Sequence, residues 1–110
     1  MREEKLLDYL KVACQGRVKS TRSSTLERIL GCSGNELRKQ VNRLRRKSVP
    51  IGSNRDGYFY AVTAGEVYST IRQLQKMAEG LNAAIYGLEK SLESFDAGQM
   101  HRPPGGGERP

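Results

Sequence analysis

The spacing of apolar residues between positions 33 and 47 predicts an amphipathic helix. Leu37, Val41 and Leu44 recur at intervals of four and three, so they fall on one narrow stripe of a helix with 3.6 residues per turn. The opposite side is cationic and rich in amides, and carries no carboxylate. This outward side is expected to present Asn35, Lys39, Asn42 and Arg46, flanked by Arg38 and Arg43.

Ser33, followed three residues later by Glu36, gives this helix the pattern of a capping box. In such a box the Ser33 hydroxyl oxygen accepts the Glu36 N–H, and the Glu36 carboxylate accepts the Ser33 N–H. Arg, Lys and Asn suit the DNA major groove, where Arg or Lys donates to guanine and Asn pairs with adenine. We therefore interpret the segment as a recognition helix, with a solvated basic face as the alternative.

Upstream, residues 3–14 favour a first helix that Gly16 ends. Glu3 and Glu4 favour its positive N-terminal end. The inner face of this helix is expected to comprise Leu6, Leu7, Leu10 and Ala13. Residues 17–20 alternate polar and apolar side chains, and this alternation predicts a short strand.

A brief second helix is predicted to start at Ser24, because Ser24 and Glu27 repeat the capping-box spacing. Its inner residues are expected to be Leu26, Ile29 and Leu30. Gly31 can end this helix, and Ser33 caps the next one two residues later. Two capped helices with so short a connection are typical of a helix-turn-helix.

The residues after position 47 favour a β-hairpin. Residues 49–53 contain Pro and Gly, residues 57–62 are aromatic and β-favouring, and residues 54–57 form a turn signal. Pro50 suits an edge position, and Arg55 at the tip is either a phosphate or minor-groove contact or simply exposed. Phe59 is expected to be buried. Tyr58 and Tyr60, on the other side of the strand, are expected to pack against the following helix.

This order of elements, with the hairpin sequence Pro50-Ile51 to Gly57-Tyr58, resembles the N-terminal winged-helix domain of the biotin repressor family over roughly residues 6–60. The resemblance implies that the recognition helix enters the major groove and that the wing contacts the DNA backbone. It assigns these contacts to Arg38, Lys39, Asn42 and Arg55. No biotin-binding or ligase domain follows, so enzyme activity is not implied. The layout is also similar to small helix-turn-helix proteins of phages and mobile elements.

Residues 67–95 predict a long helix with a heptad repeat. Apolar residues recur at alternating intervals of four and three throughout, and the helix would be about 43 Å long at 1.5 Å per residue. A helix of this length needs a partner, most simply a second copy of the chain. The predicted dimerisation residues are Ile71, Leu74, Leu81, Ile85, Leu88 and Leu92.

The direction of the partner helix stays open in the sequence. Ile at a and Leu at d favour a parallel pair, but opposed charges at e and g are scarce and the apolar stripe widens through Met77 and Ala84. An antiparallel dimer, packing against the first helix of the partner, and a helix folded back on its own domain are the alternatives. Gly80 and Gly87 both fall at position c, away from the heptad stripe.

Charge is concentrated in the N-terminal part of this chain of 110 residues, whose formal charge is +7. Residues 1–60 hold 14 of the 19 Lys and Arg residues against 6 acidic ones, which gives +8. That distribution points to a polyanionic partner. No segment reaches the roughly 18 apolar residues of a membrane span, and the first residues lack a signal peptide's apolar region. A cytoplasmic location is therefore expected.

Cys14, Cys32 and His101 do not have the spacing of a metal site or a disulfide framework, so no metal or other cofactor is expected. The cysteines are interpreted as small buried residues. The expected organisation is α+β and mostly helical: a winged helix-turn-helix domain at 1–62, a coiled-coil dimerisation helix at 63–95 and a disordered tail at 96–110.

The sequence thus favours a dimeric, sequence-specific protein that binds double-stranded DNA and acts as a transcriptional regulator. The alternative is a non-catalytic adaptor or accessory factor in replication or recombination, whose winged helix binds a protein or a nucleic acid without strong sequence specificity. RNA binding is less favoured, because exposed aromatic residues on a sheet are few. An enzyme is least favoured, since no nucleophile with a base and no phosphate-binding Gly loop can be assembled.

Overall fold

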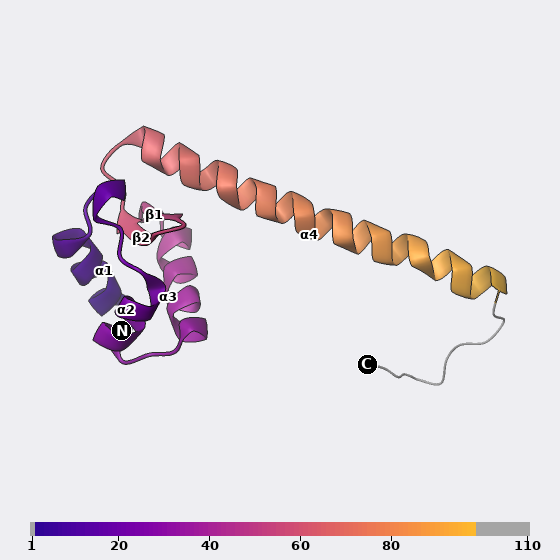
Figure 1. The fold of residues 1–110 in the computed structure, drawn as a ribbon, viewed down its shortest axis with the longest axis horizontal. Helices are drawn as coiled ribbons and strands as arrows, with labels where there is room; N and C mark the ends of the chain where they lie inside the picture. The colour runs from indigo at the N-terminus through magenta and orange to yellow at the C-terminus, as the bar shows by residue number, and fades with distance from the viewer. Residues whose placement is uncertain (1, 99–110) are drawn as a thin grey trace. The chain divides into compact units, whose positions relative to one another are not determined.

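The computed structural model describes the backbone of residues 2–98 and the side chains of residues 3–95. Its elements are α1 (Arg2–Ala13), the 3-10 turn η1 (Arg17–Lys19), α2 (Ser23–Leu30), α3 (Gly34–Arg46), β1 (Ile51–Asn54), β2 (Gly57–Tyr60) and α4 (Ala64–Gly98) (Figure 1). This mostly helical α+β order confirms the predicted fold class and is consistent with a winged helix-turn-helix followed by a long helix. The chain forms two compact units: the first unit ends at Gln73, and the second begins at Leu74.

The core of the first unit is built from one stripe of each helix and from the hairpin. The predicted stripe of α3 is buried as expected. The buried apolar residues are Leu6, Leu10, Cys14, Leu26, Leu37, Val41, Leu44, Ile51, Phe59 and Ala61. Gln40 is buried beside the stripe, although the sequence pattern did not indicate it. The core is small, as the apolar content of the chain requires.

Two predicted core positions are wrong. Ala13 is exposed, because it is the last residue of α1 and the next inward position is taken by Cys14, four residues after Leu10. Ile29 is 47% exposed, because the short α2 is deeply buried only at Leu26. Cys14 is a buried filler as predicted, and its Sγ lies 3.0 Å from the hydroxyl oxygen of Thr21. Cys32 is half-buried.

The segment between α1 and α2 differs from the predicted strand at residues 17–20. These residues form η1, in which the Ser20 N–H and hydroxyl both donate to the Arg17 carbonyl oxygen. Gly16 enters the turn with φ 83°, a conformation that favours glycine. Pairing with β2 occurs only at the flanks, where Gln15 bridges Tyr60 and Thr21 bridges Tyr58. The segment therefore pairs with β2 at two separate bridges, and η1 lies between them.

Of the two predicted ends of α2, the C-terminal one is confirmed and the N-terminal one is wrong. Gly31 ends α2 in the left-handed conformation, as predicted. The predicted capping box at Ser24 is wrong, because α2 starts one residue earlier with Arg22 as its N-cap. The carbonyl oxygen of Arg22 accepts the Thr25 and Leu26 N–H groups, and the Ser23 hydroxyl donates to Glu27 at 2.8 Å.

β1 and β2 form the predicted antiparallel hairpin, with Ile51 opposite Tyr60 and Asn54 opposite Gly57. The turn is Arg55-Asp56, and the Asp56 N–H donates to the Asn54 side-chain oxygen at 2.8 Å. The buried ring of Phe59 lies directly over Gly52 on the facing strand. Tyr58 and Tyr60 are half-buried and pack against the core. The hairpin is thus fixed to the first unit by its inward aromatic ring.

α4 is bound to the first unit through its first turns. The Glu66 N–H donates to the Thr63 hydroxyl oxygen, and the Glu66 carboxylate accepts the Val62 N–H at 2.8 Å and the Arg17 N–H at 2.9 Å. These backbone donors lower the pKa of Glu66. Thr70 is buried, and its hydroxyl oxygen accepts the Ser53 N–H of β1. This start resembles a capping box that sequence reading missed, although Thr63 and Glu66 have the required spacing.

The predicted long helix is one continuous element, and it extends three residues beyond its expected end, to Gly98. The remainder of the predicted tail, including His101, lies outside the described residues. Every described side chain from Ile71 to Phe95 is exposed. None of the helices within residues 2–98 combines the length and the hydropathy that crossing a membrane requires.

Candidate nucleic-acid interface

α3 presents one polar face to solvent. Ser33 is its N-cap, and the Ser33 hydroxyl oxygen accepts the Glu36 N–H at 3.1 Å, which confirms half of the predicted capping box. On the side away from the core, five of the six predicted contact residues of this helix are exposed. We call them the α3 face: Asn35, Arg38, Lys39, Asn42 and Arg46.

The members of the α3 face differ in how they are held. The Arg38 guanidinium donates to the Asn35 side-chain oxygen at 2.7 Å, so these two are mutually oriented. Lys39, Asn42 and Arg46 make no hydrogen bond or ion pair with other described residues. Because they are three and four residues apart, they form one ridge along the helix. Their donors, and the amide oxygen of Asn42, are available to a ligand.

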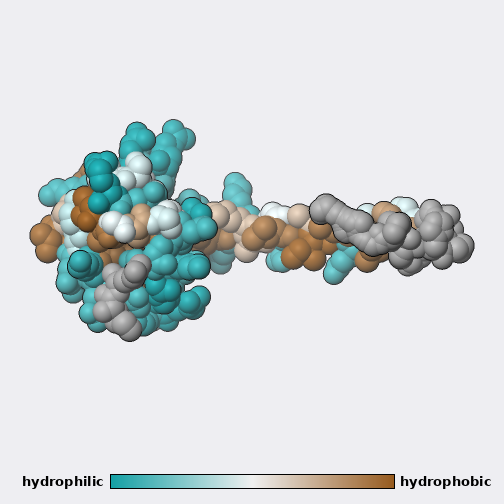
Figure 2. Space-filling model, turned by 90° about the horizontal axis from the view of Figure 1, so that it is seen from below, coloured by the Kyte–Doolittle hydropathy of each residue, from teal (hydrophilic) through white to brown (hydrophobic). Residues whose placement is uncertain are grey.

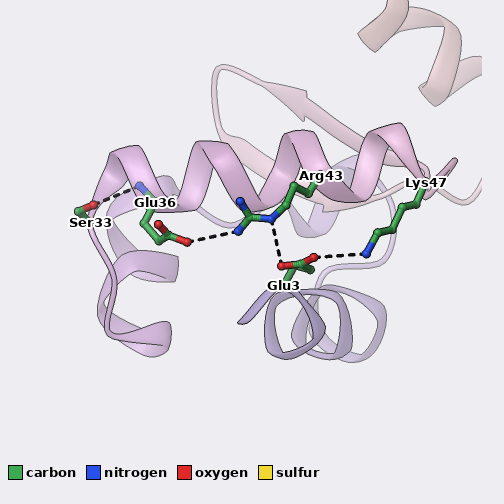
Figure 3. Close-up of polar contacts among 5 residues, drawn as sticks. All are labelled: Glu3, Ser33, Glu36, Arg43 and Lys47. Carbon is green, nitrogen blue, oxygen red and sulfur yellow. Dashed lines mark hydrogen bonds and ion pairs between the residues drawn. The ribbon is translucent and has the colours of Figure 1, made fainter. Parts of the chain in front are cut away.

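The sequence pattern predicted that Arg43 flanks the outward side of α3, but the structure holds this side chain differently. It is turned toward α1, where its Nε donates to Glu3 at 3.1 Å, and its Nη2 donates to Glu36 at 3.3 Å (Figure 3). Lys47 also reaches Glu3, at 3.3 Å. The Glu36 carboxylate is therefore paired with Arg43 rather than with the Ser33 N–H, so the second half of the predicted capping box is not formed.

The carboxylate at the centre of this cluster is nearly buried, with 8% of the Glu3 side chain exposed. Burial by itself raises the pKa of Glu3, but hydrogen bonds from its own backbone N–H, Arg43 and Lys47 outweigh that effect. The pKa of Glu3 therefore lies below its ordinary value. Glu3 is ionised at neutral pH and neutralises part of the charge on this edge of α3.

Arg45, which sequence reading did not single out, lies on the opposite edge of α3 from Arg43. Its Nε donates to the Ile51 carbonyl oxygen at 2.9 Å, and its Nη2 donates to the Ser53 hydroxyl at 3.1 Å. Burial lowers the pKa of Arg45 from its ordinary value. Two arginines of α3 thus fix the helix, one to α1 and one to β1, while the α3 face lies between them.

Arg55, the predicted contact at the hairpin tip, is exposed and has no hydrogen bond or ion pair with other residues in the described part of the chain. The tip also exposes Asp56, so it is not uniformly basic. No cluster of three or more His, Cys, Asp or Glu side chains that could hold a metal ion occurs among the residues described. The available chemistry is that of hydrogen-bond donors and positive charge.

Fold and surface together define a mostly helical α+β protein with an exposed basic helix face, an adjoining hairpin and a long terminal helix. Searches against protein families, curated proteins and solved structures found nothing that matches this chain.

Proposed function

We propose that this protein binds double-stranded DNA with sequence specificity, as a winged helix-turn-helix protein, and that two copies act together. In this proposal α3 enters the major groove, which admits an α-helix. The hairpin is the wing, and Arg55 at its tip contacts the DNA backbone. In this proposal the protein acts as a transcriptional regulator. The observation that carries the proposal is the ridge of Lys39, Asn42 and Arg46, whose side chains have no partner in the described part of the chain. They lie on a helix that Arg43 and Arg45 fix to α1 and β1.

The residue types of this ridge support base reading in addition to phosphate contact. Asn42 has both a donor and an acceptor, so it can pair bidentately with adenine. Lys39 and Arg46, on either side of it, can donate to guanine or to phosphate oxygens. Arg38 and Asn35 extend the same surface. The alternative is a basic face that is only solvated. Such a face would not need an Asn at its centre whose amide donor and acceptor make no hydrogen bond with other described residues.

The ion pairs around Glu3 also support the proposal, because they sort the basic residues of α3 into two groups. Arg43 and Lys47 are paired with carboxylates, whereas the cations of the α3 face have no acidic partner in the described part of the chain. Positive charge is thereby concentrated where a polyanion can approach.

The apolar residues of α4 support joint action of two copies. Leu81, Leu88 and Leu92 are 67%, 70% and 59% exposed, and a continuous apolar stripe of this kind marks an association surface. One domain reads few base pairs, so a second copy increases both site length and affinity.

Selection of bound sequences from random duplexes tests the proposal, followed by affinity measurements over a range of salt concentrations. We expect an enriched motif. Asn42→Ala should lose about 1–3 kcal/mol of discrimination at particular bases. Lys39→Ala should weaken binding, whereas Lys11→Ala, which removes an exposed cation from α1, should leave affinity nearly unchanged. Absence of any enriched motif, or equal losses from Lys39→Ala and Lys11→Ala, would contradict the proposal.

A further inference from the structure

We infer that the partner of α4 is a second copy of the same helix lying antiparallel to it, with the twofold axis at Ala83. This inference rests on the association of two copies proposed above and specifies its geometry. Its basis is the position of the exposed apolar residues along α4 and the character of the residues that flank them. We call the heptad positions from Ile71 to Phe95 the seam.

The start of the seam is set by contacts of α4 within the first unit. Val67 packs against the core, and Thr70 is buried with its hydroxyl oxygen bonded to the Ser53 N–H of β1. The side of α4 around these residues is therefore already covered. From Ile71 onward the apolar side chains are exposed, as far as Phe95. Figure 2 shows hydrophobic residues along the length of α4.

Complete overlap of two antiparallel seams determines the register, because the residue midway between positions 71 and 95 is Ala83. Every a position then meets a d position of the partner, as knobs-into-holes packing requires. The resulting layers are Ile71 with the partner's Phe95, Leu74 with the partner's Leu92, Ala78 with the partner's Leu88, and Leu81 with the partner's Ile85.

This register combines side chains of complementary size. The smallest seam residue, Ala78, faces a leucine, and the largest, Phe95, faces an isoleucine. A parallel pair in register would place each residue beside its own copy, so that two alanines face each other in one layer and two phenylalanines in another. Cores fill space best when small and large residues alternate across facing positions.

The residues beside the seam separate into an apolar and a polar edge. Met77, Ala84 and Ser91 lie at g, so this edge is mostly apolar, whereas Gln75, Asn82 and Glu89 lie at e. In a parallel pair the g edge of one helix lies against the e edge of the other. Reversal of one helix places g beside g and e beside e. The antiparallel pair therefore packs apolar edges together and leaves polar edges together.

Spin-label distance measurements on the full chain without DNA test this inference. Ser69→Cys and Ala83→Cys each place one label at an exposed f position, in a chain whose native cysteines are replaced by Cys14→Ser and Cys32→Ser. In the antiparallel dimer, the labels at position 83 are level with each other and are separated only by the lateral distance across the pair. Those at position 69 are separated by 28 residues along the helix, about 42 Å, in addition to the lateral distance. A parallel pair gives the same distance at both positions.

Equal distances at the two positions would overturn the antiparallel geometry and leave DNA binding untouched. If no distance between labels on two copies is detected, both this inference and the proposed association are overturned. DNA binding by the first unit is measured separately. A disulfide test on the otherwise native chain covers failure of the cysteine-free background to fold. Mixed Gln75→Cys and Glu89→Cys chains should cross-link to each other, and neither chain should cross-link at these positions alone.

Discussion

The guanidinium of Arg43 donates to the carboxylate of Glu3, 40 residues earlier in the chain, at 3.1 Å. This contact joins the first turn of α1 to the third turn of α3 (Figure 3). It fixes the orientation of α3 and turns one of its cations away from solvent. The same carboxylate accepts a hydrogen bond from Lys47, so Glu3 fixes two basic side chains that lie outside the α3 face.

Folding stability should depend on the ionisation of Glu3. Because its pKa is lowered in the folded protein, Glu3 stabilises the fold above the unfolded value of about 4.3 and loses this contribution as the pH falls through the folded value. Glu3→Gln should lower the free energy of unfolding at pH 7. It should also reduce the loss of stability between pH 6 and pH 3. Urea unfolding at both ends of this range measures the difference.

Asp8→Asn is the matched control, because it removes the same charge from an exposed position on α1. Its effect at pH 7 should be much smaller than that of Glu3→Gln. Equal effects of the two substitutions would mean that net charge, rather than the contact with Arg43, determines the stability.

Arg43 and Arg46 should separate folding from DNA binding. Arg46→Ala removes an exposed side chain that has no partner among the described residues, so the free energy of unfolding should stay within about 0.5 kcal/mol of the original. Its DNA affinity should fall, with a salt dependence weaker by about 0.9 per lost phosphate contact. Arg43→Ala leaves Glu36 without its cation and Glu3 with Lys47 alone, and it should mainly reduce stability. The reverse assignment, with Arg43→Ala the more damaging to binding by folded protein, would contradict the orientation described here.

Thr70→Val should loosen the attachment of α4 to the hairpin. The substitution keeps the shape of the side chain but leaves the Ser53 N–H without its acceptor. A loss of about 1–2 kcal/mol in the free energy of unfolding is expected. Ser69→Ala, at the exposed neighbouring position, should change it by less than about 0.5 kcal/mol. Chemical denaturation of both variants compares them, and a Thr70→Val protein as stable as the original would rule out this anchor.

Gly52 should tolerate no side chain, because a Cβ there would overlap the ring of Phe59. Gly52→Ala must displace the buried ring and should destabilise the first unit by about 1–3 kcal/mol. Gly80 has no heavy atom within 4 Å of the same position, outside its own helical surroundings. Gly80→Ala should therefore stabilise α4 by about 1 kcal/mol, as in other helices. Thermal unfolding distinguishes the two, and a Gly52→Ala chain that melts with the original would contradict the packing of Phe59.

Several features were predictable because they depend on residues that are near one another in the sequence. The buried stripe of α3 and the length of α4 follow from helical periodicity, and Gly31, Ser33 and Gly57 mark where elements end or begin. The inward position of Phe59 follows from strand alternation. Where local signals competed, prediction failed: the bridges at Gln15 and Thr21 converted an expected strand into η1, and α2 began before its expected cap.

The sequence by itself determined the apolar stripe of α3 that faces the core and the basic side that faces away, because periodicity fixes the direction of a side chain about its own helix axis. Only the tertiary structure decided which residue each of the other side chains contacts. Three residues of one type lie within four positions of α3, namely Arg43, Arg45 and Arg46. The first is paired with α1, the second with β1, and the third has no partner in the described part of the chain. Their partners come from distant segments, so the difference arises only when the chain is folded.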